Sequence, residues 1–325
     1  MLAVIYTHSH TDHCAGAPGV TSAQDVANGK VQVIAPAGFV KEVVSEWVIA
    51  GTAMGRRAFY QFGYFLPRGP QGHVGMGMGT AIAAGKQELI TPTLEIERTG
   101  QSVTIDGVEL VFHMAPDTEA PSEFDIWIPH AKALLNSETA TSTLHNVQTL
   151  RGAKVRDAKA WASHLTQALR LWGDKAEVLL TSHHWPRFGN DVIRAHLSHQ
   201  RDGYKFIHDQ TVRRMNLGQT PDEISEGLQL PSALRADWAM RGYYGTVSHN
   251  AKAVYDRYMG WYDGVPVNLN RHPPVERAKR MVAAMGGSKA LHREARIAFE
   301  RGDYRWSAEL AHNGVFADTS DTASR

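Results

Sequence analysis

Six residues close to the start of the chain, HSHTDH, bring together His8, His10, Asp12 and His13. They directly follow residues 2–6, a short apolar run with β-branched side chains that predicts a buried strand. Imidazole and carboxylate groups together bind zinc-like divalent ions, and a catalytic site of this kind leaves one position open for water. The alternative is a structural cluster whose side chains bond only to one another. An H-x-H-x-D-H run after a strand favours the metal-binding loop.

The overall composition excludes several classes of protein. The 325 residues suffice for two domains, and 43% of them are hydrophobic, enough for real cores. Lys and Arg total 34 against 33 Asp and Glu, a net charge of +1, so nothing indicates a nucleic-acid partner. No run approaches the roughly 18 to 20 apolar residues of a membrane span, and residues 2–5 are too short for a signal peptide, which leaves the cellular location open. The single cysteine, Cys14, excludes an intrachain disulfide and is expected to be a small buried thiol.

Strands and helices alternate over the first two hundred residues, which predicts an α/β layered domain at residues 1–200. A strand is expected at residues 31–35 with a helix after Pro36, and Asp106-Gly107 between two apolar runs predicts a hairpin. Residues 143–172 have helical character, and AEVLLTSHH predicts a final buried strand. The glycine-rich residues 62–85 predict a long functional loop.

The composition changes beyond about residue 195, where the segments have helical spacing with glycine or proline stops. We therefore predict a second, all-α domain at residues 201–325. Residues 290–316 have the pattern of a helical hairpin similar to a tetratricopeptide unit, and Tyr204 and Trp238 are expected in the helical core.

Longer motifs add a family resemblance. The HSHTDH loop resembles the metallo-β-lactamase superfamily, and PDTEAPSE, SETATSTLHNVQTLRGAKVRDAKAW and TSHHWPRFGN resemble its alkylsulfatase branch, of the SDS-hydrolase type. The segments HDQTVRRMNLG, RGYYGTVSHNAKAVYDRYMGWYDG and RGDYRWSAEL resemble the helical dimerisation domain of the same enzymes. The resemblance implies a metallo-β-lactamase-like αββα sandwich followed by a helical domain that forms a homodimer.

The resemblance also implies a set of ligands for two Zn²⁺ ions per chain. One ion would take His8, His10 and Glu119, and the other Asp12, His13 and His183. Glu138 would belong to the same cluster, and the acidic ligands would offset part of the positive charge around an activated water. His184 cannot face the metals together with its neighbour, so it would orient a ligand or simply pack.

The same resemblance assigns Asn146 and Arg151 to the sulfate group. A planar guanidinium can bind sulfate oxygens with two parallel hydrogen bonds. On residue type alone, Arg151 could instead be a solvated helix residue and Asn146 a capping or turn residue. Lys154 and Arg156 are expected on a solvated face. The apolar residues of the glycine-rich loop either line the site of an alkyl tail or only anchor the loop: Phe62, Phe65, Leu66, Val74, Met76 and Met78.

The resemblance therefore implies zinc-dependent hydrolysis of alkyl sulfate esters to alcohol and inorganic sulfate, with Asp12, Asn146 and Arg151 as catalytic residues. One alternative is another dinuclear hydrolase of this superfamily, acting on a lactam, thioester or phosphodiester. A second alternative is a catalytically silent dimerisation module. In the family the HSHTDH-type loop lies well inside the chain, so Met1 is expected to be an internal start, and the usual C-terminal sterol-carrier-like domain is expected to be missing.

Overall fold

The computed structural model describes residues 1–81 and 85–324, and it divides into two units, Met1–Trp261 and Tyr262–Arg325. The division expected from composition, between residues 200 and 201, falls inside one long helix of the first unit. The strands are β1 (Ala3–Ile5), β2 (Gln32–Pro36), β3 (Leu94–Ile96), β4 (Ser102–Ile105), β5 (Val108–Met114), β6 (Phe124–Ile128), β7 (Ala133–Leu135), β8 (Val178–Leu180) and β9 (Arg187–Phe188). The α-helices are α1 (Ala23–Ala27), α2 (Phe39–Val43), α3 (Gly51–Gln61), α4 (Ala158–Trp172), α5 (Asn190–Asn216), α6 (Pro221–Gly227), α7 (Ser232–Ala236), α8 (Val247–Met259), α9 (Pro266–Leu269), α10 (Pro274–Ala284), α11 (Ser288–Glu300) and α12 (Tyr304–Ala317).

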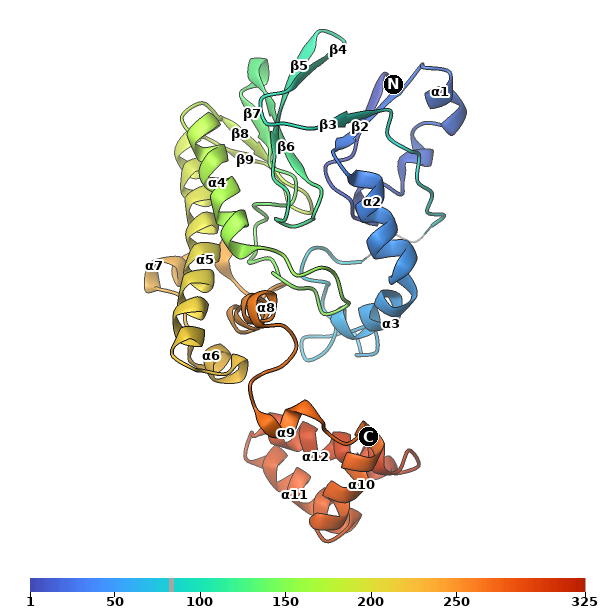
Figure 1. Cartoon of the computed structure of the whole chain (residues 1–325), viewed down its shortest axis with the longest axis vertical. Helices are drawn as coiled ribbons and strands as arrows, with labels where there is room; N and C mark the ends of the chain where they lie inside the picture. The colour runs from blue at the N-terminus through green and yellow to red at the C-terminus, as the bar shows by residue number, and fades with distance from the viewer. Residues whose placement is uncertain (82–84, 325) are drawn as a thin grey trace. The chain divides into compact units, whose positions relative to one another are not determined.

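The strands form two sheets that lie in the first unit (Figure 1). One is parallel, in the order β1-β2-β3, and its register pairs Ile5 with Ile34 and Ile34 with Leu94. The other has the order β4-β5-β6-β7-β8-β9 and is antiparallel except between β7 and β8. The expected hairpin at Asp106-Gly107 is confirmed: both residues have positive φ, 51° and 78°, and they join β4 to β5.

Side-chain alternation along β2 shows how the layers are stacked. Val33 packs in a core with Phe39 of α2, whereas Ile34 packs with Phe112 and Phe124 of the second sheet. Successive side chains of a strand point to opposite faces, so β2 is covered by a helix on one side and by the other sheet on the other. After the exposed Gln32, residues 33–36 of β2 are accordingly apolar and buried rather than alternating.

The outer face of the second sheet is covered by α4 and α5, which lie side by side in Figure 1. Trp127 and Leu134 of the sheet share one core with Trp161 of α4 and Tyr204 of α5. The order of layers is therefore helix, sheet, sheet, helix, and the expected αββα sandwich is confirmed. Tyr204 is fully buried as expected, but Trp238 is 59% exposed and does not belong to the core.

The expectation of a helix over residues 143–172 is wrong for its first half. Helix α4 begins only after Asp157, whose side chain accepts hydrogen bonds from the backbone of Lys159 and Ala160. Residues 143–147 before it are buried but irregular, and their backbone bonds to other segments and to side chains instead of to a helical turn. The Asn250 amide, for example, accepts from the backbone nitrogen of Val147 and donates to the carbonyl of His145.

The glycine-rich loop is irregular as predicted within its described residues, while residues 82–84 lie outside them. Gly77 explains why this loop needs glycine: its φ is +82°, and a Cβ there would lie 2.4 Å from the carbonyl oxygen of Tyr243. Met76 and Met78 on either side are buried, whereas the expected anchor Phe65 is 71% exposed. The backbone of the loop thus passes close to that of Tyr243 and Tyr244.

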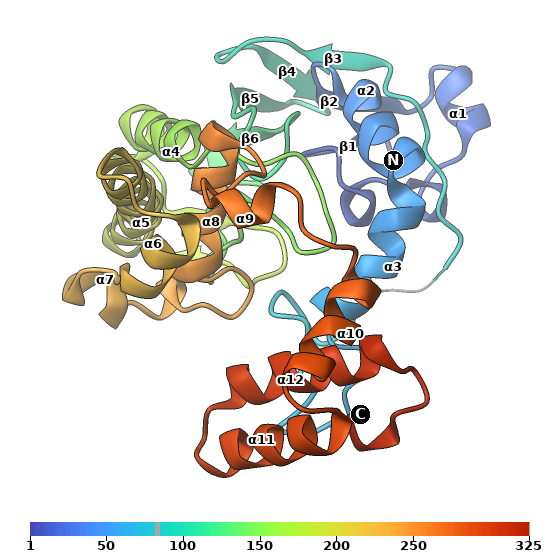
Figure 2. The ribbon, with the colours of Figure 1, turned by 60° about the horizontal axis from the view of Figure 1, so that its bottom comes forward.

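The second unit is entirely helical in its described residues. Helix α12 packs against both α10 and α11 (Figure 2), and its first turn is capped by Asp303. Its small core includes Ala278, Leu291 and Leu310. The expected helical hairpin is present as α11 and α12. Across the described residues of both units, no helix is both long and apolar enough to cross a membrane.

Candidate metal centre

The histidine-rich loop leaves the end of β1 and is tied at once to the second sheet. The backbone of Phe124 donates to the carbonyl of Thr7 at 3.1 Å, and His8 forms an isolated β-bridge with Glu123. Cys14, expected to be a buried thiol, is 3% exposed, and its Sγ donates to the carbonyl of His10. Burial raises the pKa of this thiol to about 12, so it stays protonated at neutral pH.

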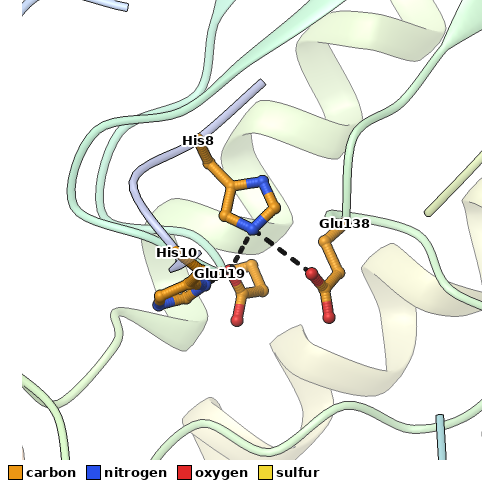
Figure 3. A group of neighbouring side chains, drawn as sticks. All are labelled: His8, His10, Glu119 and Glu138. Atoms are coloured by element: carbon orange, nitrogen blue, oxygen red, sulfur yellow. Dashed lines mark ion pairs between the residues drawn. The ribbon is translucent and has the colours of Figure 1, made fainter. Parts of the chain in front are cut away.

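The first group of candidate ligands contains four buried residues whose ligand atoms lie within 4.8 Å of one another: His8, His10, Glu119 and Glu138 (Figure 3). Nδ1 of His10 lies 2.7 Å from Oε2 of Glu119. Nε2 of His8 lies 3.4 Å from the same oxygen and 3.3 Å from Oε2 of Glu138. The two histidines come from the loop after β1, whereas the two glutamates follow β5 and β7.

The second group contains Asp12, His13 and His183, whose ligand atoms also lie within 4.8 Å of one another. The two imidazole Nε2 atoms are 3.0 Å apart, and Oδ2 of Asp12 lies 3.3 Å from one and 3.4 Å from the other. Glu138 reaches this group as well, because its Oε2 lies 3.0 Å from Nε2 of His13. One carboxylate oxygen therefore touches both groups.

The histidine that follows β8 points into the site because its backbone is unusual. His183 has φ of 65°, in the left-handed region that few non-glycine residues adopt. The neighbouring His184 faces away from the ligands, and its Nδ1 lies 3.4 Å from the backbone nitrogen of Ser142. The adjacent pair is thus divided as expected, with one ring in the site and one packed outside it.

The carboxylates of the site favour positive charge on the neighbouring imidazoles. Burial by itself would lower the pKa values of His10 and His13, but neighbouring carboxylates outweigh it. Glu119 and Glu46 raise the pKa of His10 to about 10, and Asp12 and Glu138 raise that of His13 to about 11. Without a metal, protons on the imidazoles supply the positive charge that the carboxylates require.

Two buried atoms, Nε2 of His8 and Oε2 of Glu119, have no partner with hydrogen-bond geometry among the described residues. Buried polar atoms of this kind are rare unless something binds them. Imidazole nitrogens and carboxylate oxygens are also the donor set that suits divalent ions of the zinc type. The residues of both groups therefore fit a divalent metal.

A layer of contacts behind the ligands orients them. His145 is fully buried, and its Nε2 lies 3.1 Å from Oε1 of Glu138. Arg156 is 5% exposed and donates to Oε1 of Glu119, so the expectation that it lies on a solvated face is wrong. Its guanidinium is drawn inward because the buried carboxylate needs a partner. Lys154 is exposed as expected and pairs with Glu42.

The two residues expected at the sulfate group occupy different places. Arg151 lines a cavity beside the metal ligands; its Nη1 lies 2.6 Å from Oε1 of Glu46, and the guanidinium stacks on Trp47, 4.6 Å from the ring centre. Asn146 is buried behind the cavity wall, where its Oδ1 and its carbonyl both accept from Arg156. Arg151 therefore lines the cavity, whereas Asn146 lies behind Arg156, which lines it.

The cavity has a volume of about 630 Å³ and extends from the metal ligands to an apolar wall. Its lining includes the ligands His10, Asp12, Glu119, Glu138 and His183. The larger apolar side chains of the wall belong to Trp47, Met54, Phe62, Met76 and Met78, and Ala15, Ala58 and Ala81 complete it. Of the six loop residues expected there, Phe62, Met76 and Met78 line the cavity, whereas Phe65, Leu66 and Val74 are exposed to solvent.

Sequence reasoning missed Glu46, Trp47 and Tyr244, all of which contact the site or its cavity. Glu46 and Trp47 lie in a π-helical turn, Val44–Ile49, that continues α2 and aims both side chains at Arg151. Tyr244 packs edge-on against His145, 4.8 Å between ring centres. No local pattern in the sequence distinguishes these residues from ordinary helix or loop positions.

The comparisons with known proteins agree with this geometry. The sequence model of the metallo-beta-lactamase superfamily matches residues 2–183, and that of alkyl sulfatase dimerisation matches residues 220–325. An alkyl/aryl-sulfatase of Saccharomyces cerevisiae is 48% identical over 99% of this chain and 50% of its own length. A linear primary-alkylsulfatase of Pseudomonas sp. is 46% identical over 100% of this chain and 48% of its own.

A solved structure with the same architecture is that of a stereoselective inverting sec-alkylsulfatase from Pseudomonas sp.. It is 44% identical, has a TM-score of 0.97, and is matched over 99% of this chain and 51% of that one. The chain thus spans about half the length of the curated relatives it matches.

Proposed function

The chain belongs to the metallo-β-lactamase superfamily, and we propose that it is a zinc-dependent alkylsulfatase that hydrolyses alkyl sulfate esters to an alcohol and inorganic sulfate. The observation that carries this proposal is the position of Glu138, whose Oε2 touches both groups of candidate ligands at the end of a cavity lined by Arg151. The names of the relatives at 46% and 48% identity support the substrate class.

The cavity offers the two chemistries that an alkyl sulfate needs. Arg151 presents a guanidinium, which suits a sulfate head group because its planar donors match two oxygens. Met54, whose Sδ lies 3.4 Å from Nη1 of Arg151, and the side chains of Phe62, Met76 and Met78 offer apolar surface for the tail. Methionine side chains are flexible, so this wall can repack around tails of different shape.

Two zinc ions would be held by the two groups of ligands, with Glu138 shared between them. A bound zinc ion lowers the pKa of a coordinated water, which supplies a nucleophile at neutral pH. The residues of this chain would hold the ester beside that water. Arg151 would balance the negative charge of the sulfate group, and Arg156 would keep Glu119 ionised and in position.

The match of residues 220–325 to the alkyl sulfatase dimerisation family supports a homodimer. Sedimentation velocity over a range of protein concentrations measures this directly. We expect a dimer at micromolar concentration, and a single monomeric species throughout would contradict it.

The experiment that tests the proposed function starts with elemental analysis of purified, dialysed protein. We expect about two zinc ions per chain, together with release of sulfate from a linear alkyl sulfate. Removing the zinc with a chelator should abolish turnover, and adding zinc back should restore it. A lactam, a thioester and a phosphodiester serve as comparison substrates, and faster turnover of any of them would contradict the sulfatase assignment.

Replacing Asp12 with alanine tests the dinuclear arrangement. Asp12 belongs to the second group only, so Asp12→Ala should leave about one zinc per chain and abolish turnover. Asp25→Ala changes a partly exposed aspartate on α1, outside both groups, and serves as the matched control. Full activity of Asp12→Ala would rule out the dinuclear mechanism.

Water labelled with ¹⁸O reports the bond that breaks during hydrolysis. Label in the alcohol means C–O cleavage, and label only in sulfate means attack at sulfur.

A further inference from the structure

Glu123 is a fully buried residue whose carboxyl group belongs to neither group of candidate metal ligands. Its Oε2 lies 2.7 Å from the hydroxyl of Thr118, which also contacts the carbonyl oxygen of Ala115, and it accepts a hydrogen bond from the backbone nitrogen of Ala120 at 3.0 Å. Its Oε1 accepts from the backbone nitrogen of Glu138 at 3.2 Å. Both oxygens therefore face backbone N–H groups, and each of these belongs to a different segment of the chain.

The partners of Glu123 lie next to the ligands. Thr118 and Ala120 stand on either side of Glu119, and the third partner is the backbone of Glu138 itself. The backbone of Glu123 also forms the isolated β-bridge to His8. One residue thus joins the three segments that carry His8, Glu119 and Glu138, which are otherwise far apart in sequence.

We propose that Glu123 is the positioning residue of the metal centre: it sets the distances between the ligand-bearing segments and so determines how tightly the site binds metal. This inference rests on the metal-binding part of the proposed function. Contacts behind metal ligands commonly contribute tenfold to a hundredfold in metal affinity. We expect the effect of Glu123 on metal affinity to be large, because it contacts the segments of two carboxylate ligands at once. One of them, Glu138, touches both groups.

The variant Glu123→Gln tests the proposal with almost no change in shape. A glutamine has one oxygen and one NH₂ group, so whichever way the amide turns, its NH₂ faces the backbone N–H of either Ala120 or Glu138. Two donors cannot bond to each other, and one ligand-bearing segment must therefore shift. We expect the dissociation constant for zinc, measured by competition with a chelator, to rise about tenfold or more.

Two further readouts separate positioning from a general loss of stability. The visible spectrum of the cobalt-substituted protein reports ligand geometry and should change in Glu123→Gln. The unfolding midpoint of the metal-free variant, measured in excess chelator against the metal-free parent, gives the loss of stability that does not depend on metal, and the cobalt spectrum of the folded protein is independent of that loss. Glu109→Gln is the matched control, because Glu109 is an exposed residue of the neighbouring strand β5 and should alter neither the affinity nor the spectrum.

Thr118 provides a second, milder test should Glu123→Gln fail to fold. Thr118→Val removes a single donor to Glu123, whereas Thr118→Ser keeps it. We expect a several-fold weaker affinity for zinc in the valine variant and the parent affinity in the serine variant.

The outcomes distinguish this inference from the proposed function. A folded Glu123→Gln protein with the parent affinity and spectrum overturns the role of Glu123 and leaves the sulfatase proposal standing. Equal zinc affinities of the valine and serine variants of Thr118 overturn it as well. A parent protein that binds neither zinc nor cobalt overturns the proposed function, and the positioning role falls with it.

Discussion

Arg151 and Glu46 form a buried ion pair, with 2.6 Å between Nη1 and Oε1, in the wall of the cavity beside the metal ligands. The other oxygen of Glu46 lies 3.6 Å from Nε2 of His10. The carboxylate thus lies between the guanidinium that we propose for the sulfate group and the outer edge of a candidate metal ligand. Burial by itself would raise the pKa of Glu46, but His10 and Arg151 outweigh it and hold it at about 2.

Arg151→Ala is expected to destabilise the protein by about 3 kcal/mol, because it leaves the buried carboxylate of Glu46 without its guanidinium partner. Adding Glu46→Ala to this variant should recover much of the loss, since no unpaired charge then remains. Urea unfolding of the single and double variants measures the coupling between the two residues. Additive effects of the two substitutions would show that the pair is not coupled.

The ion pair between Lys154 and Glu42 offers a matched control for that cycle. It also links the region of α2 to the segment before α4, but the Lys154 side chain is 55% exposed. Solvent screens such pairs, so Lys154→Ala should cost about 1 kcal/mol or less. A loss of stability as large as that of Arg151→Ala would contradict the explanation that burial makes the pair of Arg151 and Glu46 the stronger of the two.

His196 should make the fold sensitive to acid. Burial, and then the charge of Arg187, lower its pKa to about 4, and its ring lies 2.8 Å from the carbonyl oxygen of Ala140. Between pH 6.5 and 4 the unfolded chain gains a proton on this histidine that the folded chain does not. The stability is therefore complete above pH 6.5 and is lost as the pH falls towards 4, by a few kcal/mol at most.

His196→Gln keeps a donor at this position but removes the titrating ring. The stability of the parent relative to the variant should fall as the pH is lowered from 6.5 to 4, with both proteins measured in chelator so that metal loss does not contribute. The comparison cancels the titration of all groups that the two proteins share. Parallel curves over this range would contradict the assignment.

Gly77→Ala is expected to displace one wall of the cavity. The new Cβ would lie 2.4 Å from the carbonyl oxygen of Tyr243, and the φ of +82° is strained for alanine by about 1 kcal/mol or more. Since Met76 and Met78 flank this residue and line the cavity, the KM for a long alkyl sulfate should rise more than that for a short one. Gly19→Ala is the control, because a Cβ there meets nothing within 4 Å. An unchanged dependence of KM on chain length would show that the loop does not shape the site of the tail.

Local patterns in the sequence predicted the features whose cause is local. The HSHTDH loop contains four candidate ligands within six residues, so it predicts a metal site without any knowledge of the fold. The Asp106-Gly107 turn and the alternation of strands and helices were also predicted, because turn geometry and strand burial act over a few residues. Glu119, Glu138 and His183 were reached only through the family resemblance, since an isolated acid or histidine looks like any other.

Residues that act across the fold were decided by the tertiary structure alone. Arg156 was expected in solvent, but the buried carboxylate of Glu119 holds it inside. Glu46 and Glu123 had no signal of their own, because each acquires its partners only when a helical turn or a strand end is brought against a loop from elsewhere in the chain. The sequence by itself determined which side chains can bind a metal. The three-dimensional packing decided which distant charges orient them. An acid or a base needs a charged partner only once it is buried, and burial occurs only when the layers of the fold pack together.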